Sequence, residues 1–435
     1  MQIQLSQRAS APVDVKKLVV PVALVWAVAM VLGLGGVVVR FLTGHELANY
    51  TSSIPWGLWI ASYVYFAGIS AGAFLVSAVI YVFGIKRLEP AARLALFAAL
   101  AALLAALVTI WLDLGHQWRF YRVFLYPNPS SMMAWIVWLY MAYLILIAVE
   151  LWFVMRADLQ LWAAEPTLRG RLAALLLGRP GDALSGRPRA RAPLRDQSGA
   201  DASIVRLLAT LGIPLVIAIS GGSGALFGVV GAREYWNAPL FPLMFIVGAA
   251  ASGTGLVTAI AAVALPPSES GHPRDIVPTL GKVTLALLGV YLLIVWAEFS
   301  ITLYADIPAS TKPLSNIIGG PYAWVFWVFQ IGLGSVIPLA LLLSRPRSVA
   351  WVGLAAFLVA VGFFATRLNI VIPGLTEPQL EGLDDAFVEG RLSYSYFPSA
   401  MEWAVSFFSA ALATGLFYAG YRLLPLVSPS KESSR

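Results

Sequence analysis

The chain has 435 residues, of which 59% are hydrophobic and only 12% charged, with a formal net charge of +7. Soluble domains carry about 25% charged residues, so this composition excludes an ordinary soluble protein. The absence of cysteine excludes disulfides, c-type haem attachment, protein-ligated iron–sulfur clusters and thiolate metal sites.

Apolar runs of about 20 residues recur from end to end, and each is long enough to cross a hydrocarbon core of about 30 Å as a helix. Backbone polar groups in lipid must be satisfied within the segment, so we expect an all-α membrane protein of about ten transmembrane helices. The predicted spans lie near residues 18–40, 54–84, 94–113, 131–155, 206–230, 239–265, 280–303, 321–344, 349–371 and 401–424.

Lys and Arg are distributed unevenly between the two sides of these spans. The two termini and the segments after spans two, four, six and eight hold 22 of them, and the other side holds seven, which together make the 29 in the chain. The positive-inside rule therefore predicts that both termini are cytoplasmic. It also assigns the positive charge to membrane topology rather than to nucleic-acid binding.

Two loops stand out by composition. The longest cytoplasmic loop, near 157–203, holds seven arginines with Pro, Gly and Ser, and is predicted to be a mobile linker with no fold of its own. The outer loop 372–400 is acidic and is either solvated surface or a contact for a partner. Its acids are Glu377, Glu381, Asp384, Asp385 and Glu389.

An internal repeat divides the chain. Three pairs of segments match in the same order: Gly72–Val79 with Gly253–Ile260, Trp111-Leu-Asp113 with Trp296-Ala-Glu298, and Ala134–Trp138 with Ala323–Trp327. Each repeat holds four helices, an even number, so we expect two parallel four-helix bundles with two flanking helices. The predicted units are 1–53 (tail and first span), 54–230 (first bundle, with loop 157–203), 231–371 (second bundle) and 372–435 (outer loop, last span and tail).

The three histidines, His45, His116 and His272, fall in predicted loops or at predicted helix ends. A b-type haem inside a bundle needs two histidines at mid-helix depth, so we expect neither haem nor another metal in this chain. If the protein handles electrons, it must use a diffusible cofactor or the cofactors of a partner.

Ionisable groups in transmembrane segments are rare and by default suggest function. Asp113 ends the third span, and His116 and Arg119 follow it. A carboxylate and an imidazole three residues apart face the same way if the helix continues, and together they suit the proton transfers of quinone redox chemistry. Trp56 and Tyr63, at the start of the second span, either flank a flat head group or belong to the interfacial aromatic belt.

Other polar residues lie in or near the spans and are candidates for part of a proton path. They are Glu150, Glu298, Gln330 and Arg367. Two alternatives remain open: Asp113 and Glu298 form structural ion pairs with Arg119 and Arg367, and Glu150 snorkels to the cytoplasmic interface.

Several motifs resemble the NrfD/PsrC family, the integral membrane subunits of polysulfide-reductase-like complexes. The matching pieces are Ile54–Ile60 running into Tyr65–Gly72, Leu112-Asp113-Leu114-Gly115, and Arg367-Leu-Asn369 followed by Tyr394–Ser399 and Glu402. The last piece and the ten-span length are similar to the longer branch that includes HybB, DsrP and ActC. Many relatives have Arg-Pro after the Leu-Asp-Leu-Gly stretch, where this chain has His116-Gln117.

The resemblance implies a quinone-reactive subunit of a multisubunit respiratory oxidoreductase in a bacterial or archaeal cytoplasmic (inner) membrane. It implies a menaquinone or ubiquinone site near the periplasmic face, with Asp113 and His116 at the family's acid and polar positions. Electrons would pass to a periplasmic-side iron–sulfur subunit and a catalytic partner with molybdenum, nickel–iron or multihaem centres, with possible coupling to proton movement.

Two other functions compete with this one. A secondary transporter with parallel repeats should show broken helices and polar groups at the midplane of both halves. If the chain is a purely structural membrane anchor, replacing Asp113 and His116 should leave the turnover rate of the complex unchanged. The gathering of acids at the outer ends of the spans favours a redox site beneath the outer surface.

Overall fold

The computed structural model describes residues 15–179, 197–266, 273–380, 382–383 and 389–427. Within these ranges every regular element is a helix, and ten helices are long and apolar enough to span a membrane. The prediction of an all-α, multi-pass membrane protein is therefore confirmed. His272 and the loop acids Glu381, Asp384 and Asp385 lie outside the described residues.

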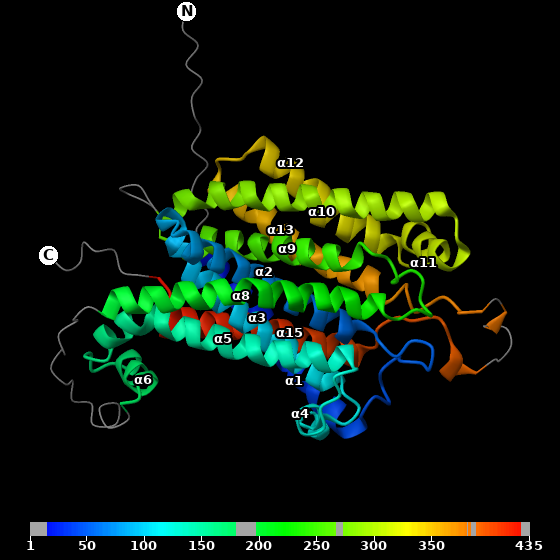
Figure 1. Cartoon of the computed structure of the whole chain (residues 1–435), viewed down its shortest axis with the longest axis horizontal. Coiled ribbons are helices and arrows are strands. Elements are labelled where there is room, and N and C mark those ends of the chain that lie inside the picture. Colours follow the sequence, from blue (N-terminus) through cyan, green and yellow to red (C-terminus); the bar gives the residue numbers. More distant parts are fainter. Residues whose placement is uncertain (1–14, 180–196, 267–272, 381, 384–388, 428–435) are drawn as a thin grey trace, which may run out of the picture.

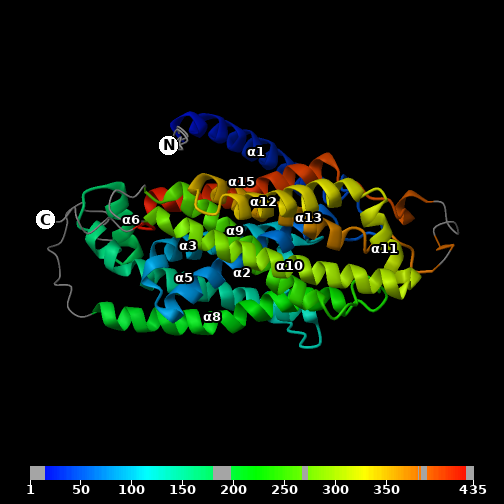
Figure 2. The same cartoon turned by 90° about the horizontal axis from the view of Figure 1, so that it is seen from above.

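The membrane-spanning helices are long and run roughly along one direction (Figures 1 and 2). They are α1 Val15–Thr43, α2 Leu58–Phe83, α3 Glu89–Asp113, α5 Met132–Trp162, α8 Gln197–Gly228, α9 Phe241–Ala264, α10 Val277–Ala305, the π-helical η4 Val325–Val336 continuing as α12 Ile337–Ser344, α13 Val349–Val371 and α15 Ala400–Leu423. Shorter helices connect them: η1 Lys86–Leu88, η2 Gln117–Arg119, α4 Arg122–Leu125, α6 Leu168–Leu176, η3 Pro273–Ile276, α11 Pro308–Ile318 and η5 Gly390–Leu392.

Contacts between the helices form two groups. In the first, α2 contacts α3 and α8, while α5 contacts α3 and α8. In the second, α13 contacts α9, α10 and η4, while α10 contacts α9. The groups meet where α2 packs on α9 and α13 and where α8 packs on α9. Outside both groups, α15 packs on α1 and on α3. The internal repeat itself stays a prediction.

α1 lies at one edge of the bundle (Figure 2), and its apolar side chains are largely exposed. An exposed apolar surface of this length is suited to lipid, because lipid tails solvate it as a protein core would. We call the end of the bundle that carries Asp113 the Asp113 end. The opposite end holds the start of α1 and the end of α15.

The segment predicted to be an unstructured linker is partly helical, so that prediction was wrong for its first part. α5 continues to Trp162, and α6 follows with Thr167 as its N-cap, the side chain accepting a hydrogen bond from the Gly170 backbone N–H at 3.1 Å. Trp152 of α5 donates to the carbonyl of Leu176 at 3.0 Å, which holds α6 against α5. Residues 180–196 lie outside the described part of the chain.

Small residues set the distance between α2 and α9. A Cβ built on Gly72 would lie 1.8 Å from the carbonyl oxygen of Ala249, and one built on Gly253 would lie 2.4 Å from the Gly72 Cα. The two backbones therefore touch at this point, as is common where membrane helices pack through glycine.

Replacing Gly72 by alanine is expected to lower the free energy of unfolding by about 1–3 kcal/mol, because α2 and α9 must separate to admit the methyl group. The measurement is thermal unfolding in detergent. Gly289→Ala is the matched control, since nothing lies within 4 Å of a Cβ at this site on α10. A Gly72→Ala protein as stable as this control would contradict the close packing.

Candidate functional site

Asp113 is the last residue of α3, because Leu114 turns the chain into an extended conformation at φ −61° and ψ 132°. The hydroxyl of Tyr50, in the loop between α1 and α2, donates a hydrogen bond to Asp113 Oδ1 at 2.8 Å. Burial raises the pKa of Tyr50 well above its ordinary value, and the negative charge of Asp113 adds to this. Tyr50 therefore stays protonated and acts as a constant donor to the carboxylate.

His45 stands beside this pair. Its ring centroid lies 5.5 Å from that of Tyr50 and 5.8 Å from that of Trp59. The pKa of His45 is lowered by burial and by the positive charge of Arg40, against a smaller opposing interaction with the Asp113 backbone. Arg40 Nη2 lies 3.4 Å from His45 Nε2, and arginine can only donate, so the imidazole is neutral with its proton on Nδ1.

Arg40, in the last turn of α1, caps the end of α3. Its Nε donates to the carbonyl of Leu112 at 3.0 Å and its Nη2 to the carbonyl of Leu114 at 2.8 Å. With its amide oxygen turned toward the guanidinium, Gln117 accepts from Arg40 at 2.9 Å. A cation at a helix C-terminus satisfies free carbonyls and complements the helix dipole, so Arg40 fixes where Asp113 sits.

A second buried acid, Glu402, opens α15 next to this site. The hydroxyl of Tyr396 donates to Glu402 Oε1, and the backbone N–H groups of Asn49 and Ser399 donate to Oε2 at 3.0 and 2.9 Å. Burial and the charge of Glu402 raise the pKa of Tyr396, so this phenol also remains a donor. Glu402 is therefore fully hydrogen-bonded and holds the loop before α2 to the start of α15.

These residues form what we call the Asp113 cluster. Its members come from α1, the loop after it, α2, the end of α3 and the start of α15. They are Arg40, His45, Tyr50, Trp59, Asp113, Tyr396 and Glu402.

One side of the Asp113 cluster adjoins an aromatic surface. Phe41, Trp111 and Trp118 pack ring to ring with centroids 5.6–6.1 Å apart. Phe41 and Trp118 are exposed, and Trp111 is the second residue before Asp113. This surface is flat and apolar, and it lies where α1 and α3 end.

The structure does not bring His116 to the carboxylate. Since α3 ends at Asp113, His116 lies in an exposed turn, and no hydrogen bond joins the two side chains. Arg119 is exposed as well. The imidazole beside Asp113 is His45, which sequence reasoning assigned only to a loop.

The two aromatic candidates on α2 also point elsewhere. Trp56 stacks on Trp236 with centroids 5.8 Å apart, and Tyr63 packs edge-on against Tyr140 at 5.9 Å. Trp59 is instead the α2 residue that joins the Asp113 cluster.

No hydrogen bond joins any two of the four proton-path candidates, all of which lie in the described residues. Both carboxylate oxygens of Glu150 are buried without a hydrogen-bond partner, while Gln330 accepts from Asn369 at 2.7 Å. Glu298 is half-buried on α10, and Arg367 is buried on α13. The alternative of structural ion pairs was wrong for Asp113 and Glu298, because neither is paired with Arg119 or Arg367; the ion pairs of the described residues join Arg93 to Asp158 and Arg156 to Asp201.

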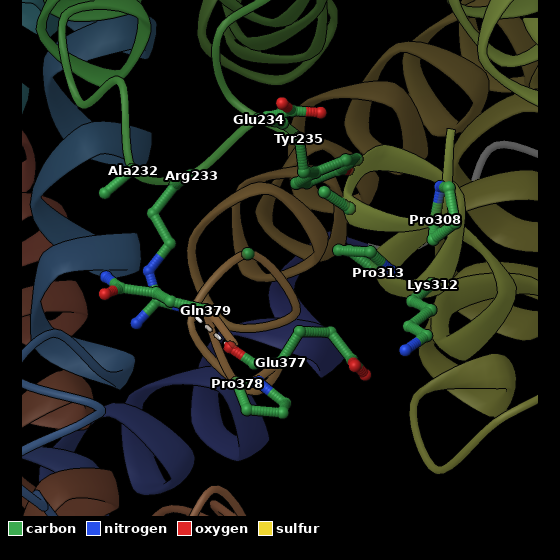
Figure 3. Close-up of a pocket in the computed structure, with 12 residues that line it drawn as sticks. Ala232, Arg233, Glu234, Tyr235, Pro308, Lys312, Pro313, Glu377, Pro378 and Gln379 are labelled. Carbon is green, nitrogen blue, oxygen red and sulfur yellow. Dashed lines mark hydrogen bonds between the residues drawn. The ribbon is translucent and has the colours of Figure 1, made fainter. Parts of the chain in front are cut away.

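A separate pocket of about 160 Å³ opens at the same end, over the second helix group (Figure 3). Arg233 on its wall donates to the backbone carbonyl of Glu377 at 2.6 Å, and Asn316 donates to the Glu377 side chain. Lys312 of α11 and Glu234 complete its charged lining. The pocket has acids and bases of both signs and does not include any member of the Asp113 cluster.

Nothing in the described residues resembles a metal site, since no group of three or more His, Asp or Glu side chains converges.

The sequence pattern of the family described as polysulphide reductase, NrfD, matches residues 46–379, which is more than half of the chain. The chain belongs to the NrfD family. The family resemblance predicted from the motifs is thereby confirmed.

Relatives across the family cover nearly the whole chain. A selenate reductase subunit of Mesobacillus selenatarsenatis is 33% identical over 92% of this chain and 93% of that protein. The Hdr-like menaquinol oxidoreductase integral membrane subunit of Archaeoglobus fulgidus is 27% identical over 93% of each chain. The menaquinone reductase integral membrane subunit of Nitratidesulfovibrio vulgaris is 22% identical over 87% of this chain and 85% of that protein. This NrfD protein is thus similar along its length to subunits of several different reductases.

Proposed function

We propose that this NrfD protein is the quinone-reactive membrane subunit of a respiratory oxidoreductase, with its site at the Asp113 cluster. The observation that carries the proposal is the hydrogen bond from Tyr50 to Asp113 beside the neutral imidazole of His45. Relatives named as menaquinol oxidoreductase and menaquinone reductase subunits support the same class of function.

The residues fit a quinone or quinol head group by their chemistry. The exposed aromatic surface of Phe41, Trp111 and Trp118 suits a flat ring arriving from lipid. Bound there, quinol supplies two electrons and two protons. Asp113 is the proton acceptor, and the neutral imidazole of His45 is a polar neighbour beside it. Tyr50 holds the carboxylate in place and lowers the free energy of its charged form.

Electrons must leave through a partner, because the chain has no cysteine to ligate a cluster. We assign the Asp113 end to the periplasmic face, following the distribution of Lys and Arg. An iron–sulfur subunit bound at that end accepts the electrons and passes them to a catalytic redox subunit. The terminal substrate is then a property of the catalytic partner, in keeping with the varied reductases named among the relatives.

Binding of a quinone analogue to the purified protein tests this proposal. We expect saturable quenching of tryptophan fluorescence in mild detergent, because Trp59 packs against His45 in the Asp113 cluster and Trp111, packed on Trp118, lies two residues before Asp113. His45→Ala is expected to weaken binding about tenfold, the loss typical of one hydrogen bond in a buried site. His116→Ala is the matched control and is expected to bind as the unchanged protein does.

The competing functions give different results. Absence of quenching by the analogue, with no quinone extracted from the purified protein, would refute the proposal and direct attention to solute uptake in liposomes. Weaker binding in His116→Ala but not in His45→Ala would place the site in the exposed turn after α3.

A further inference from the structure

Arg367 carries a positive charge into the interior of the bundle without a partner. It is 2% exposed, its Nη1 has no hydrogen bond, and no carboxylate of the described residues pairs with it. Its electrostatic neighbours are the tyrosines Tyr140 and Tyr291. An arginine guanidinium stays protonated in proteins, and a buried charge is normally paired because its desolvation is so costly.

Two glycines on neighbouring helices leave room for the guanidinium of Arg367. A Cβ on Gly68 of α2 or on Gly248 of α9 would each lie 3.4 Å from Arg367 Nη2. The guanidinium also lies over the ring of Phe245, 4.2 Å from its centroid. The side chain therefore reaches from α13 across the contact between the two helix groups.

A small cavity lies against the guanidinium. It offers about 10 Å³ to the centre of a water-sized sphere, which is room for one water or one monatomic ion. Its walls come from α2, α5, α8, α9 and α13. Gly68 lies ten residues into α2, so the cavity is about 15 Å along the helix axis from the Asp113 end.

Apart from Arg367, the polar side chains that line this cavity carry hydroxyls. Ser223 already donates its proton to the carbonyl of Ile219 at 2.8 Å. The buried hydroxyls of Tyr140 and Ser220 make no hydrogen bond of good geometry, although that of Tyr140 lies near the hydroxyls of Tyr63 and Ser223, so both are available as donors. The side chain of Tyr291, whose hydroxyl also has no hydrogen-bond partner, lies near Arg367: a Cβ on Gly248 would lie 3.3 Å from Tyr291 Cε2 and 3.4 Å from Arg367 Nη2. A fixed cation surrounded by unused hydroxyl donors, with no acid among the lining residues, matches the needs of an anion.

We propose that this cavity binds one small inorganic anion, with chloride as the probe, held by Arg367 and the hydroxyls of Tyr140 and Ser220. The size of the cavity excludes sulfate and phosphate. The anion neutralises the buried guanidinium and satisfies the donors of both helix groups at once, so it stabilises the contact between them. This site is separate from the Asp113 cluster and does not depend on quinone.

Thermal unfolding of the detergent-purified chain tests the site, with chloride replacing gluconate at constant ionic strength. We expect the melting temperature to rise saturably with chloride, and bromide to give anomalous density beside Arg367. Ser220→Ala and Tyr140→Phe are each expected to raise the half-saturating chloride concentration about tenfold, the loss typical of a hydrogen bond to a charge. Arg367→Gln is expected to lose the response.

Ser77→Ala is the matched control. Ser77 lies on α2 and carries a buried hydroxyl without a partner, about 14 Å along the helix from Gly68. It should keep the full chloride response. A melting temperature that does not change with chloride in the unaltered chain would overturn the proposal and leave water as the occupant. An equal response in Ser220→Ala and Tyr140→Phe would overturn it too, even if Arg367→Gln fails to fold.

Discussion

Asp113→Asn is expected to lower kcat/KM for quinol oxidation by the intact complex about 100-fold or more, because a positioned proton acceptor contributes about 10²–10⁴. Asparagine keeps the shape of the side chain, and its oxygen still accepts from Tyr50, so the protein should fold and assemble. The substitution therefore removes only the ability of this side chain to accept a proton. The measurement is quinol oxidation with an artificial electron acceptor, normalised to the amount of assembled complex.

Asp306→Asn is the matched control for this change, since Asp306 is an exposed acid at the end of α10. It should leave the rate unchanged. An Asp113→Asn complex that turns over at the unaltered rate would show that the chain acts as a membrane anchor. A slow complex that still binds the quinone analogue would separate proton transfer from binding.

Much of the fold follows from simple properties of the sequence. The ten spans were predictable because each apolar run must satisfy its backbone polar groups internally, and the boundaries agree to within a few residues for most spans. Asp113 was predicted as a site residue because an acid at the end of an apolar run is rare, and its role stays a prediction. The linker prediction failed for α6 because an Arg-rich composition concealed a capped helix that packs on Trp152.

The partner of Asp113 could not be found from local spacing. The expected pairing with His116 required α3 to continue, but the helix ends and the chain turns at Leu114. His45 instead lies beside Asp113 because Arg40, in the last turn of α1, donates to the carbonyls of Leu112 and Leu114 at the end of α3. A charged Arg40 at the end of an apolar span was the one available signal, because such a residue is costly in a membrane unless it has a role.

Glu402→Ala is expected to cause the largest loss of stability, about 3–5 kcal/mol in the free energy of unfolding. The carboxylate is fully buried and accepts from Tyr396, Asn49 and Ser399, so its removal leaves these donors unpaired inside the protein. The measurement is denaturation in detergent. Glu402→Gln should lose less, since its amide oxygen can still accept from part of the set.

Glu389→Ala is the control for Glu402→Ala, because Glu389 is an exposed acid in the segment that precedes α15. It is expected to unfold as the unaltered protein does. The loop that carries His45 and Tyr50 is tied to α15 through Asn49 and Glu402, so the destabilised protein should also bind the quinone analogue more weakly. Unchanged stability in Glu402→Ala would contradict the role of the Glu402 carboxylate in holding the Asp113 cluster.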